Sequence, residues 1–317
     1  MTDLFVSVDL GGTQTRAALC DPQGKILKRV QSPTPARQGA EAVVENLRRT
    51  VRGVWPIDDE VKALGVAVPG PLDPRKGVIL YSPNIPGWEG YPLAETLHRI
   101  FDVEVRIDDD ANAAALGEHR FGAGRGKSNL VYLTIGTGVG GGFIVDGRLV
   151  RGSRGLAGEA GHMILADKSP IACGCGQRGC LESLVSGPAL AEMARLALRA
   201  DKPSMILVLA GGDMAAIEGR TVGEAANLGD PVARALLSKA GAWLGLGLVN
   251  LMLIFDPEIV IIGGSVSQAG DCLLEPARHV VERHRLARFW KGTPIVTAKL
   301  GDDAGLLGAL TLVCPGE

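Results

Sequence analysis

The chain has 317 residues, of which 46% are hydrophobic and 21% are charged, and its net charge at pH 7 is −2. This length is enough for one large domain or two medium ones with complete hydrophobic cores. The slightly acidic charge and the aromatic content of 4% argue against binding to nucleic acid or to an anionic membrane surface. Residues 1–9 lack the basic and apolar regions of a secretory signal, and the apolar run 242–255 is short and glycine-rich for a membrane span. We therefore expect a cytoplasmic protein without a membrane partner, in which the six cysteines stay reduced.

The first predicted elements form a meander of three strands around a glycine-rich turn. The strands are expected over residues 5–8, 17–20 and 25–30, and the glycine-rich turn over residues 9–16. The same succession recurs at residues 130–133, 134–142, 143–145 and 148–150. Residue 134 corresponds to residue 9 and residue 146 to residue 21, so the two copies keep a constant offset. This repetition predicts a duplicated architecture with two facing halves.

Helices and strands alternate through the rest of the chain, which predicts an α/β fold with mixed sheets. We expect helices over residues 40–54, 92–101, 110–118, 188–199, 231–255 and 304–313. Further strands are expected over 61–68, 103–107 and 258–262. The long helix carries Gly241, Gly245 and Gly247, which would let another element pack closely against it. Residues 202–220 give only the pattern of a variable surface segment.

One histidine and three cysteines lie within a short, glycine-rich window, residues 158–182. They are His162, Cys173, Cys175 and Cys180. Three thiolates and one imidazole complete the tetrahedral shell of a structural Zn²⁺ and leave no open position. The alternative is a set of buried thiols beside a core histidine, which does not explain the Cys-x-Cys-x4-Cys spacing. Glu159 and Glu182 flank the window, and a closed zinc shell has no use for them, so the metal is expected to shape a loop that serves another purpose.

The two glycine-rich turns are candidates for a phosphate site, although no Walker A loop is present. Two such turns, one from each half, can offer backbone N–H groups to a polyphosphate from opposite sides. Asp9 in the first turn would hold Mg²⁺, directly or through water. The spelling Gly136-x-Gly138-x-x-Gly141 matches a dinucleotide fingerprint, but a hairpin rather than a helix follows it. The alternative is two ordinary hairpins whose glycines adopt positive φ.

Asp110 is the candidate general base. It lies where a predicted strand meets a predicted helix, a place that often carries catalytic groups in α/β folds. Asp108 and Asp109 precede it directly. The alternative is that the three carboxylates only cap the helix.

At this point the motifs resemble, in order and over nearly the whole length, those of the ROK family of sugar kinases, and most closely its bacterial-type glucokinases. The resemblance rests on the segments Asp9–Arg16, Gly65–Pro71, Ser82–Trp88, Asp110–Glu118, Gly136–Gly140, Gly158–Glu182, Ile261–Gly264 and Asp302–Gly305. It implies an actin-like, ribonuclease H-type ATPase fold of two domains around a cleft. Residues 1–117 and 301–317 would form the small domain, and residues 118–300 the large domain with the zinc loop.

The resemblance also implies an activity: transfer of the γ-phosphoryl group of ATP to the 6-hydroxyl of a hexose, glucose above all. Asp110 would be the base. The implied sugar-binding residues are Asn84, Asp109, Asp110, Glu159, His162 and Glu182. The implied contacts to ATP and Mg²⁺ are Asp9, Gly11, Gly12, Thr13, Thr137, Gly138, Gly263 and Gly264. A homodimer or homotetramer is expected from the family alone.

Two positions depart from the family's pattern. Asp109 stands where the family usually has Asn, and a carboxylate only accepts hydrogen bonds. Ser265 stands where a third glycine is usual. Kinases for N-acetylmannosamine, N-acetylglucosamine, fructose or allose stay open, as does polyphosphate as the donor. A ROK-type sugar-responsive regulator is a poorer expectation, since the phosphate motif begins at Asp9 and leaves no room for a helix-turn-helix before it.

Overall fold

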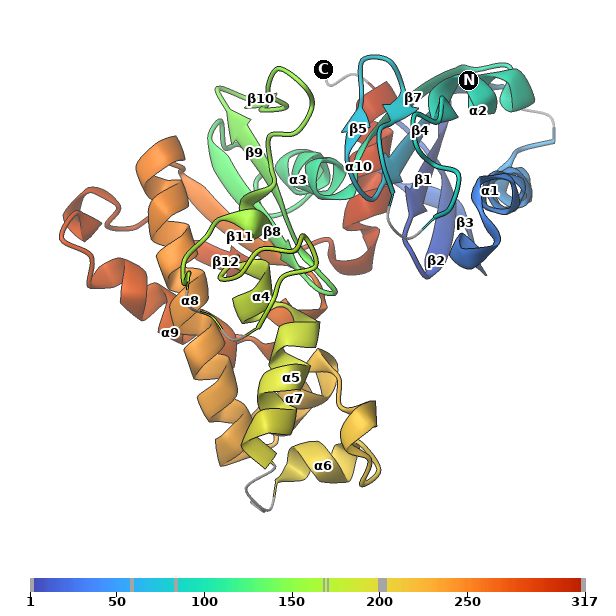
Figure 1. Cartoon of the computed structure of the whole chain (residues 1–317). Helices are drawn as coiled ribbons and strands as arrows, with labels where there is room; N and C mark the ends of the chain where they lie inside the picture. The colour runs from blue at the N-terminus through green and yellow to red at the C-terminus, as the bar shows by residue number, and fades with distance from the viewer. Residues whose placement is uncertain are drawn as a thin grey trace. The chain divides into compact units, whose positions relative to one another are not determined.

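The computed structural model describes residues 3–57, 60–82, 85–167, 169, 171–198 and 204–314. The chain forms two compact units (Figure 1). Unit 1 comprises residues 1–126, 148–158 and 299–317, and unit 2 comprises residues 127–147 and 159–298. The domain limits expected from the sequence stay a prediction, and two features of this division bear on them. The segment 148–158 groups with unit 1, and helix α3 (Asp110–Phe121) continues past residue 117 within the same unit.

Two five-stranded sheets share one topology, as the repeated meander predicts. The first has the order β3-β2-β1-β4-β7 and the second β10-β9-β8-β11-β12. In each sheet the first strand in sequence pairs antiparallel with the second and parallel with the fourth. The first sheet contains β1 (Leu4–Leu10), β2 (Gln14–Cys20), β3 (Ile26–Pro33), β4 (Val61–Val68) and β7 (Glu104–Asp109). The second contains β8 (Leu130–Ile135), β9 (Val139–Val145), β10 (Arg148–Leu149), β11 (Ile259–Gly263) and β12 (Ile295–Thr297).

The first sheet is covered on both faces, because alternate residues of β1 point to opposite sides. Val6, Val8 and Leu10 join the core made with α1 (Ala40–Val54) and α2 (Leu93–Phe101). Phe5 joins the opposite core made with α10 (Ala304–Val313). Asp9 shares the parity of Phe5 and therefore points to the α10 face.

Helix α10 lies in direct backbone contact with α3 and β4. A Cβ atom at Gly65 would overlap the carbonyl oxygen of Ala309, and one at Gly308 would overlap that of Ala113. At Gly117 it would lie 2.8 Å from the carbonyl oxygen of Ala304. The absence of side chains at these positions thus allows the close approach of three elements.

In unit 2, the apolar helix α8 (Pro231–Phe255) packs against α9 (Asp271–Glu282). A Cβ at Gly241 would overlap the carbonyl oxygen of Leu273, and one at Gly245 would lie 2.6 Å from that of Ala277. The glycines of this helix therefore serve close packing, as predicted. Among the described residues, α8 is the one helix whose length and composition would suit a membrane span, and 56% of its apolar window is buried inside the structure.

Several predicted elements are confirmed at their limits, namely α1, β4, α8 and α10. The strands and helices of the structure that have not yet been given are β5 (Leu72–Asp73), β6 (Val78–Ile79), α4 (Glu182–Val185), α5 (Gly187–Leu198), α6 (Met205–Leu209) and α7 (Gly219–Asn227). Short 3-10 helices cover 36–38, 160–162, 214–216, 265–269, 287–289 and 301–303. The segment 202–220, predicted only to be a variable surface segment, is described from residue 204 and contains α6, the 3-10 helix 214–216 and the first two residues of α7. The apolar run Met205–Leu209 is too short for its pattern to predict a helix.

The backbone contact of α10 with α3 predicts a sharp stability effect. Gly308→Ala should lower the free energy of unfolding by about 1–3 kcal/mol, because the helices must separate to admit one methyl group. Chemical denaturation followed by circular dichroism measures this. Gly12→Ala is the matched control, since a Cβ there meets no atom within 4 Å. Equal stability of the two variants would show that the close approach is not required.

Candidate functional site

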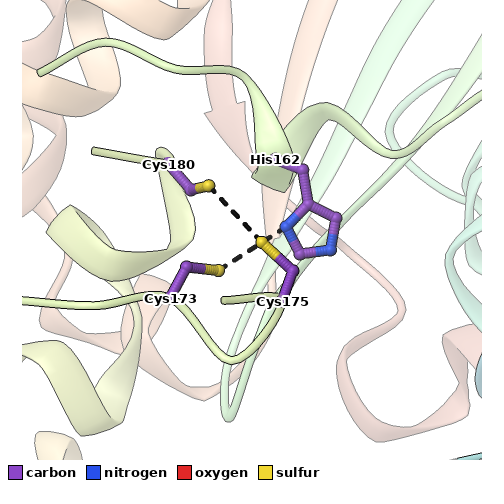
Figure 2. A group of neighbouring side chains, drawn as sticks. All are labelled: His162, Cys173, Cys175 and Cys180. Atoms are coloured by element: carbon purple, nitrogen blue, oxygen red, sulfur yellow. Dashed lines mark hydrogen bonds between the residues drawn. The ribbon is translucent and has the colours of Figure 1, made fainter. Parts of the chain in front are cut away.

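The four residues predicted to bind zinc lie together in unit 2 (Figure 2). Their ligand atoms all lie within 4.8 Å of one another. The Cys175 and Cys180 sulfurs are 3.8 Å apart, and Cys173 Sγ is 3.6 Å from His162 Nδ1. A tetrahedral Zn²⁺ with bonds of about 2.3 Å to sulfur places its sulfur ligands about 3.8 Å apart. The donor set and its spacing therefore fit zinc.

The cysteines differ in their surroundings. Burial raises the pKa of the Cys173 thiol, while hydrogen bonds from the Gln177 backbone lower the pKa of the exposed Cys175. A bound metal ion would favour the thiolate form at all positions. The orientation of the histidine is also informative, because Nδ1 faces the thiols and leaves Nε2 on the other side. Nε2 lies 3.8 Å from Glu159 Oε2, and the Glu159 side chain is 49% exposed.

Glu182 joins the metal loop to the second glycine-rich hairpin. Its Oε2 accepts a hydrogen bond from the Val139 backbone N–H at 3.0 Å, and its Oε1 accepts one from Cys173 Sγ at 3.2 Å. A Cβ at Gly138 would lie only 2.7 Å from Oε2. A side chain at position 138 would therefore displace the Glu182 carboxylate from its present place beside the hairpin.

The predicted adenosine-side motif lies beside the same hairpin. Gly263 ends β11, and Gly264 has φ +83°. A Cβ at Gly263 would overlap the hydroxyl of Tyr132, and one at Gly264 would overlap the carbonyl oxygen of Ile135, so both glycines have packing reasons. Ser265 Oγ would lie 3.7 Å from a Cβ at Gly136. The departure from glycine at 265 thus adds a hydroxyl next to the exposed Thr137 turn.

In unit 1, the first hairpin presents Gly12 and Thr13 at its exposed tip. Two hydrogen bonds hold the turn. The Gly11 N–H donates to the carbonyl oxygen of Gln14 at 2.8 Å, and Thr34 Oγ1 donates to the carbonyl oxygen of Gly11 at 2.8 Å. Gly12 has neither positive φ nor a neighbouring atom that would meet a Cβ. Packing within the described chain therefore does not require glycine at this position.

Asp9 lies just before this turn, against the start of α10. A Cβ at Gly305 would come within 2.9 Å of both carboxylate oxygens. Burial raises the pKa of Asp9, while Arg16, whose Nη1 lies 3.7 Å from Oδ2, acts in the opposite direction. A divalent cation near a buried carboxylate would favour its charged form. Asp9 therefore fits a Mg²⁺ site.

The Asp triplet lies in the same row of the sheet as Asp9. Asp9 pairs with Ala67 in β4, and Ala67 pairs with Asp108 in β7. Since neighbouring strands are about 4.8 Å apart, the two Cα atoms are separated by roughly 10 Å. Asp109 is the N-cap of α3, with Oδ1 accepting from the N–H groups of Ala111 and Asn112 at 3.0 and 3.3 Å. Asp110 is thus the first residue of the helix, at the carboxyl end of a parallel strand.

The predicted site residues therefore form two groups, one in each unit. Unit 1 brings Asp9, the first hairpin and Asp110 to one edge of its sheet. Unit 2 brings Glu159, His162 and Glu182 to the metal cluster and the second hairpin. Asn84 lies outside the described residues. Arg151 was not predicted from the sequence, because its contact with Asp108 leaves no local pattern. Gly305 lies in the motif Asp302–Gly305, but its closeness to Asp9 was not predicted.

With this geometry established, the ROK family profile matches residues 5–315. The chain belongs to the ROK family. It is 36% identical to a glucokinase of Streptomyces coelicolor over 312 residues, which are 98% of this chain and 97% of that protein. Among solved structures it is similar to a ROK family glucokinase from Streptomyces griseus in complex with glucose and AMPPNP. That likeness has 36% identity and a TM-score of 0.85, and it covers 99% of this chain and 100% of the other.

A second solved structure, the ROK hexokinase from Thermus thermophilus, is 38% identical with a TM-score of 0.78 over 98% of this chain and 97% of that one. These likenesses and the shared strand order of the two sheets confirm the actin-like α/β fold. The family resemblance read from the sequence is likewise confirmed.

The metal cluster gives a direct prediction. The purified chain should hold about one Zn²⁺, and Cys175→Ser should lose most of it, because a hydroxyl is a poor replacement for a thiolate ligand. Cys175 is exposed, so this substitution leaves no cavity. Elemental analysis measures the metal content, with Cys272→Ser as the control outside the cluster. Full zinc content in Cys175→Ser would contradict the assigned ligand set.

Proposed function

We propose that the protein is an ATP-dependent hexose kinase that phosphorylates the 6-hydroxyl of glucose. The observation that carries the proposal is the extent of the match to glucokinases, since 98% of the chain takes part in it. All the described residues with proposed roles therefore fall within the shared region. The fit of the two groups of residues to a sugar and to a polyphosphate supports the same reading.

Asp110 is the proposed base, accepting the proton of the sugar hydroxyl as that oxygen attacks phosphorus. Its backbone is held in the first turn of α3, beside the cap residue Asp109. Such a group contributes mainly by orienting the acceptor and removing its proton, since phosphoryl transfer depends chiefly on positioning and charge.

Glu159, His162 and Glu182 are the proposed sugar contacts in unit 2, with Asn84 and Asp109 completing them. The metal would hold His162 by Nδ1, which fixes the tautomer and turns Nε2 toward Glu159 and the substrate. Zn²⁺ has a closed donor set in this site, so its proposed contribution is to order the loop. Asp109 uses Oδ1 to cap the helix. Either a carboxylate or an amide can do this, which explains why Asp can stand where the family usually has Asn.

The two hairpins are the proposed donors to the phosphates of ATP. Gly11, Gly12 and Thr13 would serve from unit 1, and Thr137 and Gly138 from unit 2. Gly263 and Gly264 would lie on the adenosine side. Bound ATP supplies the transferable γ-phosphoryl group, and Asp9 would hold the accompanying Mg²⁺. Polyphosphate remains the alternative donor, because backbone N–H groups bind either chain.

The homo-oligomer and the cytoplasmic location stay proposals with less support, resting on the family resemblance and on composition. The other hexoses remain alternatives to glucose as substrate. One experiment separates them: a coupled ADP-release assay over a hexose panel, run in parallel with polyphosphate and detection of sugar phosphate. Turnover with glucose and ATP is expected. Absence of turnover with every sugar, together with specific binding to DNA, would favour the regulator instead.

Asp110→Asn should bind glucose with nearly unchanged affinity and lose kcat by roughly 10²- to 10⁴-fold, because the amide cannot accept the proton. Calorimetric titration measures binding, and the coupled assay measures turnover. A kcat near that of the parent enzyme would remove Asp110 from the role of base.

Gly12→Ala should fold normally and raise the KM for ATP about tenfold or more, since the added methyl group occupies space reserved for phosphate. Gly223→Ala, whose Cβ would meet only Ala269 at an ordinary 3.7 Å, is the control in unit 2. An unchanged KM for ATP in Gly12→Ala would place the phosphates elsewhere.

A further inference from the structure

Asp108 is a buried carboxylate for which the proposed reaction has no direct use. Its side chain is 2% exposed, and its Oδ2 accepts a hydrogen bond from Arg151 Nε at 2.7 Å. A buried carboxylate that loses its cation is strongly destabilised. Removing the Arg151 guanidinium would therefore leave a buried carboxylate without the cation that it contacts.

The other oxygen of Asp108 organises the start of α3. Oδ1 accepts from the Asp109 backbone N–H at 2.9 Å and from Asn112 Nδ2 at 3.1 Å. Asp109 in turn caps the helix through the N–H groups of Ala111 and Asn112. Asp110 lies inside this network, with fixed neighbours on both sides in the sequence.

Arg151 comes from a distant part of the sequence, the segment 148–158. This segment belongs to unit 1, whereas the residues before and after it belong to unit 2. It is itself ordered, because the Ala157 N–H donates to the carbonyl of Arg151 at 3.1 Å and Gly155 approaches Pro74 closely. Glu159, a proposed sugar contact, follows Gly158 directly.

We propose that Arg151 is a positioning residue for the base Asp110 and acts through Asp108. The inference rests on the proposed function for its kinetic consequence, but its structural part stands independently. Without the guanidinium, Asp108 would be a buried carboxylate without this cation, and its movement toward water would break its hydrogen bonds with the Asp109 N–H and Asn112 Nδ2. The first turn of α3 would then lose its cap and Asp110 its direction.

Four variants test the inference, because the double variant is compared with Asp108→Asn alone. Arg151→Gln removes the charge; its side chain borders a cavity of about 760 Å³ rather than a packed core, so the substitution leaves no new void. Arg154→Gln is the matched control, an exposed arginine of the same segment. Asp108→Asn combined with Arg151→Gln asks whether the arginine acts through the carboxylate, since Asn keeps the Oδ1 acceptor but needs no cation.

Arg151→Gln should lower kcat roughly 10- to 100-fold with the KM values for glucose and ATP changed by less than about threefold, as expected for misplacement of a reacting group. Hydrogen exchange at the Ala111 and Asn112 amides should become faster. Arg154→Gln should change neither. In the Asp108→Asn background, the same Arg151 substitution should have no further effect on kcat or on exchange.

Several results would overturn the inference. A rise in KM at constant kcat would make Arg151 a substrate ligand, and an equal loss of kcat in the Asp108→Asn background would mean that it acts independently of Asp108. If the parent enzyme turns over no hexose, the proposed function fails, and the exchange measurement still decides. Unchanged exchange in Arg151→Gln would then refute the inference by itself.

Discussion

The contact on which unit 1 depends is the one between the backbones of α10, α3 and β4. It exists because Gly65, Gly117 and Gly308 carry no side chain. Through it the start of α10 reaches Asp9 at the end of β1, and the start of α3 follows β7 in the same row of the sheet. A packing constraint in the core thus places two carboxylates of different proposed roles at one edge.

Unit 2 meets a different requirement. Its proposed sugar contacts lie at short helical turns and the loops beside them, which have few regular backbone hydrogen bonds. A closed tetrahedral donor set would compensate by cross-linking the loop through four side chains. Glu182 extends this order to the Gly138–Val139 turn. The metal cluster and the second hairpin are therefore one structural unit, although they are separate motifs in the sequence.

Much of this was predictable from local patterns. The repeated meander predicted a duplicated architecture, and the structure has two sheets of one topology. Apolar periodicity predicted α1 at its limits, and a long apolar run predicted α8 at its limits. The spacing of three cysteines and one histidine predicted a cluster that the structure brings within bonding range of one ion. The two meanders align without a gap in sequence, yet their hairpins differ in the structure. The turn of the second hairpin is one residue shorter than that of the first.

What the sequence did not reveal are contacts between residues far apart in the chain. Arg151 meets Asp108, and Gly305 meets Asp9, only after the sheet and its helices have assembled. A lone arginine such as Arg151 has no spacing that indicates its partner, and the motif that contains Gly305 does not indicate that Asp9 lies beside it. The glycines of the Ile261–Gly264 motif show that a recognised pattern can have more than one cause. The family resemblance assigns them to a ligand, but close packing within the chain is also a sufficient reason for glycine there.

The central claim is that a base at the start of α3 directs one sugar hydroxyl to the γ-phosphoryl group. The most direct test is the position of the phosphate in the product. Glucose labelled with ¹³C, incubated with ATP and the purified enzyme, should show phosphorus coupling at carbon 6 and, through three bonds, at carbon 5, and at no other carbon in its NMR spectrum. Phosphate at another carbon, or ADP and inorganic phosphate without any sugar phosphate, would contradict the account.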